Sequence, residues 1–277
     1  MRGQPAPANS SAEPAAKAPA ATASAPAPRR AIEIEHVEKT FGARSGGAAL
    51  TVLDDISLTI EENAFVSLVG RSGCGKTTLL NILAGLEAPT AGSVRIAGRP
   101  VAGPGQGQGV VFQQHALFPW LTALENVKFG GRKRPVPAAE KEAIARDLLA
   151  LVGLEAAADK YPREMSGGMQ QRVAIARALA LDPDILLMDE PFGALDELTR
   201  IELQDELLRI WQARRKTVVF VTHSISEALI LSDRIILLAP HPGRIARDVT
   251  VDLPRPRSRT DPRFAALYET IWDGLKA

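Results

Sequence analysis

The stretch that decides the fold reads Gly70-Arg71-Ser72-Gly73-Cys74-Gly75-Lys76-Thr77 and is followed by Thr78. It fits the pattern G-x-x-x-x-G-K-[ST], in which a glycine-rich loop surrounds phosphate groups. The apolar run 64–69 before it predicts a strand, and residues 76–84 after it predict a helix that Gly85 ends. Backbone N–H groups of such a loop and the positive end of the helix dipole both face the phosphates. The order of strand, loop and helix therefore predicts a phosphate site made by residues 70–78.

Three side chains of this loop have predicted roles. Lys76 is expected to bridge the β- and γ-phosphates of a nucleotide, and the hydroxyl of Thr77 is expected to ligate Mg²⁺. Cys74 is the only cysteine of the chain, which excludes an internal disulfide and fits a reducing compartment. Because a helix N-terminus lowers the pKa of a thiol, we expect the thiol of Cys74 to be reactive and to be shielded by bound nucleotide.

A second apolar run ends in two acidic residues. The run 185–188 predicts a strand that delivers Asp189 and then Glu190 at its carboxyl end. An aspartate at this place holds hydrated Mg²⁺, and the adjacent glutamate is placed to polarise an attacking water as a general base. A kinase that protects its phosphoryl group from water has no need of this glutamate, so the pair favours hydrolysis. The competing interpretation is a strand that ends in two solvated acids.

From Ala31 onward, short apolar runs alternate with helical patterns. Further helices are predicted over residues 141–152, 169–181, 203–210, 224–231 and 262–275. Further strands are predicted over residues 184–188, 217–221 and 234–239. Apolar strands between helices predict an α/β fold with a mainly parallel sheet covered on both faces, which binds ligands at the carboxyl ends of its strands.

A third motif reads Met165-Ser166-Gly167-Gly168-Met169-Gln170-Gln171-Arg172. It resembles the signature of ATP-binding-cassette (ABC) proteins, Leu-Ser-Gly-Gly-Gln, with Met165 and Met169 in place of the Leu and the last Gln. These departures occur in importer branches of that family. Ser166 is placed to cap the helix that follows, whose N-terminus makes a second anion site. The resemblance implies a head-to-tail homodimer in which ATP lies between one chain's phosphate loop and Ser166, Gly167 and Gly168 of the other.

Other segments match the same family in the same order, roughly over residues 31–240. Gln113 resembles the residue of the glutamine loop, which implies contact with Mg²⁺ or the attacking water. Residues 191–196 resemble the loop that crosses the dimer interface, which implies that Asp196 lies near nucleotide. His223 resembles the switch histidine at the γ-phosphate, and Phe41 is placed like the aromatic residue that stacks on adenine. The alternatives are ordinary packing for Phe41, a polar strand end for Gln113 and a structural role for His223.

The resemblance also implies the overall architecture and the chemistry. It implies a P-loop NTPase cassette over residues 31–277, with a mainly parallel core sheet, an antiparallel β region, a helical signature subdomain over about residues 115–175 and a C-terminal extension over residues 240–277. The implied cofactors are ATP and Mg²⁺, and the implied reaction is ATP hydrolysis coupled to transport. The implied catalytic residues are Glu190, His223 and Gln113, and the implied metal ligands are Thr77, Gln113 and Asp189.

Three further features resemble the branch that imports nitrate, taurine and aliphatic sulfonates. They are Phe118-Pro119-Trp120, the Ser-Gly-Gly-Met sequence, and the tail with His241-Pro242-Gly243-Arg244-Ile245 and Leu253-Pro254-Arg255-Pro256-Arg257. The branch implies two integral membrane permease subunits, a periplasmic binding protein that acts indirectly, and a place on the cytoplasmic face of the bacterial inner membrane. Taurine or an aliphatic sulfonate is favoured over nitrate. Phe118, Trp120 and Leu121 are either core of the helical subdomain or a docking groove for a permease helix.

Composition excludes some classes of function and leaves others open. The net charge of +1 gives no basic surface for nucleic acid, and no apolar run is long enough to span a bilayer. Residues 1–30 are mostly Ala, Pro and Ser, which predicts a disordered tail. A soluble cassette ATPase of DNA repair or translation remains an alternative, although such chains usually carry a coiled-coil insertion or two cassettes. His36, His115 and His241 are expected to have surface or structural roles.

Overall fold

The computed structural model describes residues 1, 3, 29–42, 49–105, 107–114, 116–193 and 195–276. Almost all of the predicted disordered tail over residues 1–30 lies outside the described residues, and so does His115. Among the described residues, no helix has the length and apolar character needed to cross a membrane.

The main sheet has six strands in the order β10-β9-β3-β8-β7-β6. Its strands are β3 (Phe65–Gly70), β6 (Gln108–Val111), β7 (Ile185–Asp189), β8 (Thr217–Thr222), β9 (Arg234–Ala239) and β10 (Arg244–Thr250). All neighbouring pairs are parallel except β10 with β9, which are antiparallel. Every residue of β3, β7 and β8 is buried, as continuous apolar strands between two layers require.

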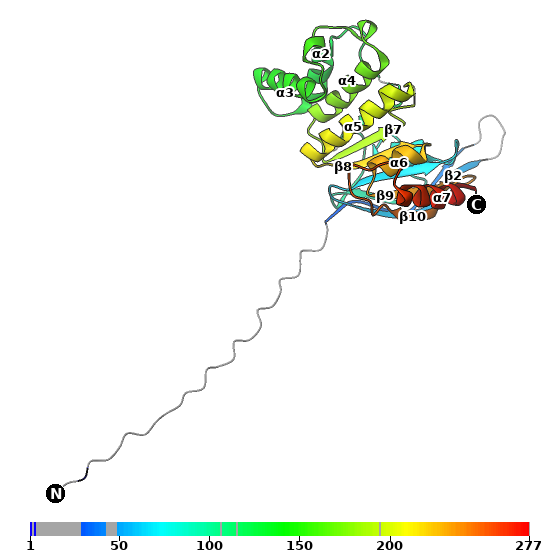
Figure 1. The fold of residues 1–277 in the computed structure, drawn as a ribbon. Coiled ribbons are helices and arrows are strands. Elements are labelled where there is room, and N and C mark those ends of the chain that lie inside the picture. The colour runs from blue at the N-terminus through cyan, green and yellow to red at the C-terminus, as the bar shows by residue number, and fades with distance from the viewer. Residues whose placement is uncertain are drawn as a thin grey trace.

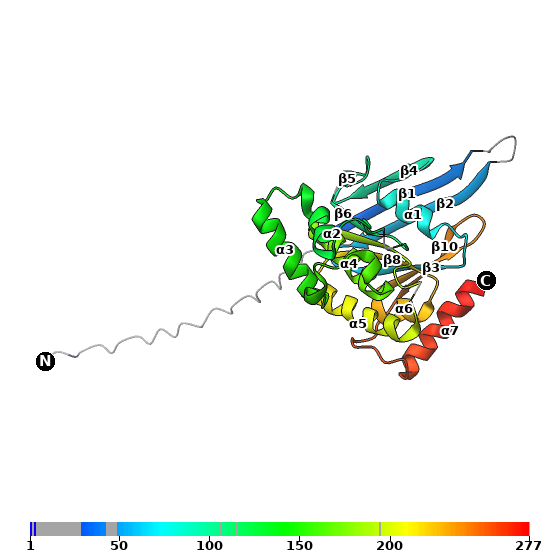
Figure 2. The same cartoon turned by 90° about the horizontal axis from the view of Figure 1, so that it is seen from above.

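A second, antiparallel sheet of four strands has the order β2-β1-β4-β5. These strands are β1 (Arg30–Phe41), β2 (Leu50–Glu61), β4 (Ala91–Ile96) and β5 (Arg99–Pro100). Figure 2 shows β1, β2 and β4 on one side of the molecule, with α1 (Lys76–Leu83) beside β2. The predicted combination of a mainly parallel core sheet and an antiparallel β region is therefore confirmed.

Two hydrophobic clusters cover the two faces of the main sheet. Phe65 and Val69 of β3 point into the cluster that contains α4 (Gly167–Ala180), α5 (Glu197–Ala213) and α6 (Ile225–Leu231). Val66 and Leu68 of the same strand point into the cluster that contains α1 and strands β1 and β2. This alternation follows from the period of two along a strand.

The helical part lies at one end of the molecule, where Figure 1 shows α2 (Ala123–Gly130), α3 (Ala138–Leu151) and α4 grouped in green. Three short 3₁₀ helices, Gly131–Lys133, Glu155–Ala157 and Pro162–Glu164, connect its helices. The predicted helix over residues 169–181 begins two residues earlier, at Gly167, because Ser166 caps it by accepting a hydrogen bond from the N–H of Met169 at 3.3 Å.

The C-terminal extension ends in α7 (Pro262–Lys276), which packs against α6 and β9. Arg257 fastens the segment before α7 to α6. Its guanidinium donates to four carbonyl oxygens, those of Leu253, Leu229, Ser232 and Val251. Burial and, to a smaller extent, the nearby charge of Arg255 lower the pKa of Arg257 to about 10.

Replacing Arg257 with methionine tests this anchor. Arg257→Met keeps much of the aliphatic packing and leaves the four carbonyl oxygens without their shared donor. We expect the free energy of unfolding to fall by about 2 kcal/mol or more. Urea unfolding followed by circular dichroism measures it. Arg263→Met is the control, because Arg263 is exposed and pairs with Asp261, only two residues away. Equal stability of the two variants would contradict the anchoring role.

Candidate functional site

The phosphate loop lies between β3 and α1, as the sequence predicts. Gly75 adopts the left-handed conformation, with φ 91°, directly before Lys76 opens α1. A side chain at Gly75 would collide with Leu53, because an added Cβ would lie 2.5 Å from its Cδ2. The ammonium of Lys76 donates to the carbonyl oxygens of Gly70 at 2.8 Å and Arg71 at 3.1 Å. Lys76 therefore closes the loop on itself at the N-terminus of α1.

A polar cavity of about 450 Å³ opens above this loop. Its walls come from β2, the phosphate loop, the segment after β6 and the segment after β7. The lining residues are Val52, Ser72, Gly73, Gly75, Lys76, Thr77, Thr78, Gln113 and Glu190. Backbone amides at a helix N-terminus and a lysine suit phosphate oxygens, so the residues present fit a nucleotide polyphosphate. Val52 was not expected here, because a single valine in a strand carries no functional signal.

Thr77 and Asp189 meet at the side of this cavity. The hydroxyl of Thr77 donates to Oδ1 of Asp189 at 3.2 Å. Burial raises the pKa of Asp189, and the hydrogen bond from Thr77 acts in the opposite direction. Hydroxyl, carboxylate and amide oxygens are hard ligands of the kind that Mg²⁺ prefers, and Gln113 lines the same cavity. The three side chains therefore fit the metal that the sequence implies.

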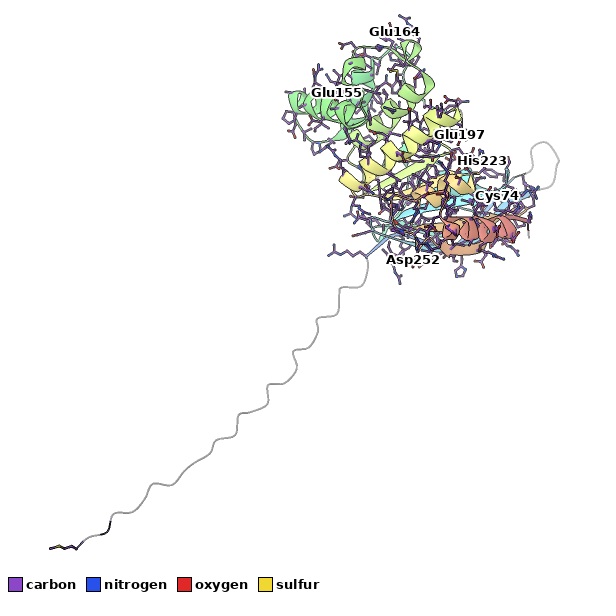
Figure 3. All side chains as sticks on the ribbon, in the orientation of Figure 1. Cys74, Glu155, Glu164, Glu197, His223 and Asp252 are labelled. Carbon is purple, nitrogen blue, oxygen red and sulfur yellow. The ribbon has the colours of Figure 1, made fainter. Side chains whose placement is uncertain are left out.

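Glu190 and His223 are brought together although they follow different strands. Nδ1 of His223 lies 3.1 Å from Oε2 of Glu190, and Figure 3 labels His223 just before α6. Glu190 has a φ of 41°, a left-handed conformation that costs a non-glycine residue about 1–3 kcal/mol. Its N–H donates to the carbonyl oxygen of Val221 at 2.9 Å, which helps to hold this conformation. The expected general base and switch histidine thus form one pair at the cavity wall.

The other expected site residues do not line this cavity within a single chain. Ser166 and Gly167 are exposed at the start of α4, and Phe41 is 40% exposed at the end of β1. Asp196 caps α5 by accepting a hydrogen bond from the N–H of Thr199 at 3.1 Å. Hydrogen bonding with Thr199 lowers the pKa of the Asp196 carboxyl. Gly168 is buried against Thr199, since an added Cβ would lie 2.7 Å from Cγ2 of that residue.

The expectation of a reactive thiol at Cys74 is wrong. The side chain is fully buried and belongs to the hydrophobic cluster between the two sheets. Burial raises the pKa of the Cys74 thiol, and this outweighs the opposing effect of the Lys76 charge. The physical reason is direction, because the loop turns the Cys74 side chain into the hydrophobic core.

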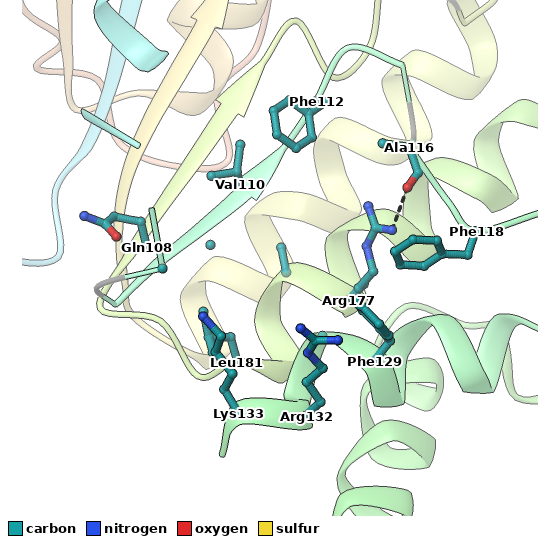
Figure 4. A pocket seen from close by; sticks show the side chains of 14 residues that line it. Gln108, Val110, Phe112, Ala116, Phe118, Phe129, Arg132, Lys133, Arg177 and Leu181 are labelled. Carbon is teal, nitrogen blue, oxygen red and sulfur yellow. Dashed lines mark hydrogen bonds between the residues drawn. The ribbon is translucent and has the colours of Figure 1, made fainter. Parts of the chain in front are cut away.

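A second cavity, of about 390 Å³, lies between β6 and the helical part. Figure 4 shows that aromatic and positively charged side chains gather around it: Phe112, Phe118, Phe129, Arg132, Lys133 and Arg177. The rings of Phe118 and Phe129 lie 4.5 Å apart, and Arg177 donates to the carbonyl oxygen of Ala116 at 2.7 Å. Phe118 is half-buried, whereas Trp120 is 70% exposed. Packing therefore accounts for Phe118 but not for Trp120.

The family model described as ABC transporter matches residues 53–193. The chain belongs to the ABC transporter family. An uncharacterized ABC transporter ATP-binding protein of Methanocaldococcus jannaschii is 52% identical over 245 residues, which cover 88% of this chain and 91% of the relative. The bicarbonate transport ATP-binding protein CmpD of Synechocystis sp. is 48% identical over 252 residues, 88% of each chain. The aliphatic sulfonates import ATP-binding protein SsuB of Bacillus licheniformis is 47% identical over 240 residues, 87% of this chain and 92% of the relative.

A solved structure supports the same assignment. The ATP-binding cassette MJ0796, in a dimeric post-hydrolysis state bound to ADP and Pi, has a TM-score of 0.70 and 36% sequence identity to this ABC transporter chain. The similarity covers 80% of this chain and 100% of that one. The predicted family and cassette fold are confirmed, and the chain is a nucleotide-binding ATPase of a transport family.

The burial of Cys74 predicts slow chemical modification. We expect maleimide to leave the native ABC transporter chain unlabelled, with or without ATP, and to label it fully in denaturant, because a buried neutral thiol is a poor nucleophile. Mass spectrometry of the intact chain measures the labelling. Rapid labelling of the native chain, prevented by ATP, would instead support a reactive thiol at Cys74.

Proposed function

We propose that this chain is the ATP-hydrolysing subunit of a bacterial importer for a small anion. The observation that carries the proposal is a polar cavity lined by the phosphate loop, Gln113 and Glu190. Beside it, Thr77 donates a hydrogen bond to Asp189, and the ring of His223 contacts the carboxylate of Glu190. A phosphate loop alone serves kinases and hydrolases alike. An acid beside the cavity with a histidine on its carboxylate favours attack by water.

In the proposed mechanism, Lys76 and the loop amides bind the β- and γ-phosphates of ATP. Bound Mg²⁺, held by Thr77, Asp189 and Gln113, would neutralise charge on the phosphate oxygens. Glu190 accepts a proton from the attacking water, and His223 keeps that carboxylate in place through the contact at 3.1 Å. The second ring nitrogen of His223 then stays available for the γ-phosphate, and the exposed ring of Phe41 stacks on adenine.

A homodimer completes the proposed site. Ser166, Gly167 and Asp196 are exposed and are not among the residues that line the cavity of their own chain. The start of α4, capped by Ser166, offers free backbone amides that suit the γ-phosphate bound by a second copy. The dimeric cassette structure described above is consistent with this arrangement.

Replacing Glu190 with glutamine tests the general base. Glu190→Gln removes the proton acceptor and keeps the size of the side chain. We expect ATP hydrolysis to fall by about 100-fold or more while ATP still binds and holds a closed dimer. Phosphate release and size-exclusion chromatography with ATP measure the two effects.

Lys76→Ala is the contrasting variant. It removes a charge-assisted contact to phosphate, so we expect ATP affinity to fall about tenfold or more. A Glu190→Gln chain that hydrolyses ATP at the wild-type rate would refute the role of Glu190 as general base. A Lys76→Ala chain with unchanged affinity for ATP would refute the contact of Lys76 with phosphate.

The proposed membrane partners are two integral permease subunits, which would place the chain on the cytoplasmic face of the inner membrane. The cavity in Figure 4 offers aromatic walls and cationic side chains, and the indole of Trp120 is exposed near Phe118, with ring centroids 5.5 Å apart. This surface suits a short permease helix with apolar and acidic side chains. A periplasmic binding protein would act through those subunits.

The favoured cargo is taurine or an aliphatic sulfonate, supported by the similarity to SsuB. Bicarbonate is a second candidate, because CmpD is equally similar, and nitrate remains from the sequence resemblance. All are small anions, so one ATPase design serves each of them, with the permease and binding protein selecting the cargo.

Uptake of radiolabelled taurine, an alkanesulfonate, bicarbonate and nitrate tests the cargo. Cells of the source organism that carry Lys76→Ala in the chromosomal gene should lose uptake of one anion class and retain the others, because ATP no longer drives that importer. The wild-type gene restored in trans is the control. Unchanged uptake of all four anions would refute the small-anion proposal and favour a cassette ATPase with another role.

A further inference from the structure

Glu227 is a buried acid that the proposed hydrolysis does not use. It lies in the first turn of α6 and is 6% exposed. Its Oε2 accepts a hydrogen bond from the hydroxyl of Thr222 at 2.5 Å. The same hydroxyl accepts a hydrogen bond from the N–H of Ser224 at 3.0 Å. Glu227 therefore holds both neighbours of His223 in place.

The other carboxylate oxygen of Glu227 faces an arginine from α5. Its Oε1 lies 3.7 Å from Nε of Arg200. Arg200 also donates from Nη2 to the carbonyl oxygen of Leu195 at 2.9 Å and from Nη1 to Glu197 at 3.0 Å. Figure 3 labels Glu197 at the start of α5 and His223 before α6. Arg200 thus connects the segment around His223 with the loop that precedes α5.

The contact between Glu227 and Arg200 is an ion pair without a hydrogen bond. Within the part of the chain that the structure describes, Nε of Arg200 is buried and has no hydrogen-bond partner. A buried donor without a partner is unfavourable, and a charge-assisted hydrogen bond forms at about 2.7–2.9 Å. A relative movement of about 1 Å therefore converts this contact into a strong hydrogen bond.

The far end of this connection reaches the surfaces expected to face a partner's nucleotide. Leu195, whose carbonyl oxygen Arg200 holds, directly precedes Asp196. An added Cβ at Gly167 would lie 3.6 Å from Cδ2 of Leu195, so the start of α4 rests on the same residue. The buried contact of Gly168 with Thr199 ties α4 to the start of α5 as well.

We infer that Glu227 and Arg200 are positioning residues that couple the two ATP sites of a cassette dimer. Their contact transmits the position of His223, beside a chain's own nucleotide, to Leu195 and the start of α4, beside the partner's nucleotide. This inference rests on the proposed ATP hydrolysis and dimerisation. Neither residue touches the phosphate loop, so the coupling acts on turnover and cooperativity.

Steady-state ATP hydrolysis by the full chain tests the inference with four variants. Glu227→Gln keeps the shape of the side chain and removes its charge, and Arg200→Lys keeps the charge and removes the guanidinium fork that spans Leu195, Glu197 and Glu227. The double variant completes a thermodynamic cycle. Glu206→Gln is the matched control, since Glu206 also lies on α5 and pairs with an arginine, Arg209, away from His223.

Coupling predicts a distinctive pattern of kinetic constants. We expect each single variant to lower kcat by about tenfold and to bring the Hill coefficient for ATP toward 1, with the KM for ATP changed by no more than about twofold. The double variant should be no slower than the slower single variant, because both changes break one contact. Glu206→Gln should match the wild type in all three constants.

Several outcomes would overturn the coupling. They are a wild-type Hill coefficient of 1, unchanged cooperativity in both single variants, or multiplicative losses of kcat in the double variant. A lower melting temperature with unchanged kinetic constants would likewise reduce the contact to a structural role. A wild-type chain with no ATP hydrolysis under any condition would instead remove the proposed function itself, which separates the two failures.

Discussion

Parallel pairing of three neighbouring strands is the constraint on which the functional site depends. Val69 of β3 pairs with Thr222 of β8, and Asp189 of β7 pairs with Val221, which also belongs to β8. Parallel strands in this register end at one edge of the sheet, so the segments that follow them meet although they are far apart in sequence. A slip of β7 by one residue would turn Asp189 to the opposite face and remove it from Thr77.

Patterns that are local in sequence were predictable, because neighbouring residues determine them. The glycines of the phosphate loop identify it in the sequence. The apolar run before Asp189 and Glu190 likewise identifies the strand that precedes them. The direction of a side chain within a loop depends on packing from elsewhere. An added Cβ at Gly70 would touch both Cys74 and Leu238 of β9, and only the folded sheet brings that neighbour beside the loop. The burial of the Cys74 thiol could therefore not be predicted from the sequence.

The antiparallel sheet was expected only through the family resemblance, for a physical reason. Its strands carry irregularities that break the alternation of apolar and polar residues on which strand prediction depends. His36 and Asp55 both adopt left-handed conformations, with φ of 48° and 51°, and register shifts interrupt the pairing of β1 with β2. Val52 of β2 reaches the cavity wall from this sheet, so its role also required the three-dimensional structure.

Side chains connect the helices α5 and α6 through contacts of different length. Arg259 donates to Ser226 of α6 at 3.2 Å and to Gln204 of α5 at 3.1 Å, both within hydrogen-bond distance. Arg200 and Glu227 connect the starts of the same helices at 3.7 Å, beyond that distance. Arg259 of the C-terminal segment thus closes one junction, and the longer Arg200–Glu227 contact lies beside the loops that are proposed to meet nucleotide. On the inferred coupling, a displacement at His223 passes to the start of α5, because the Arg200–Glu227 contact can shorten whereas the contacts of Arg259 are already at hydrogen-bond distance.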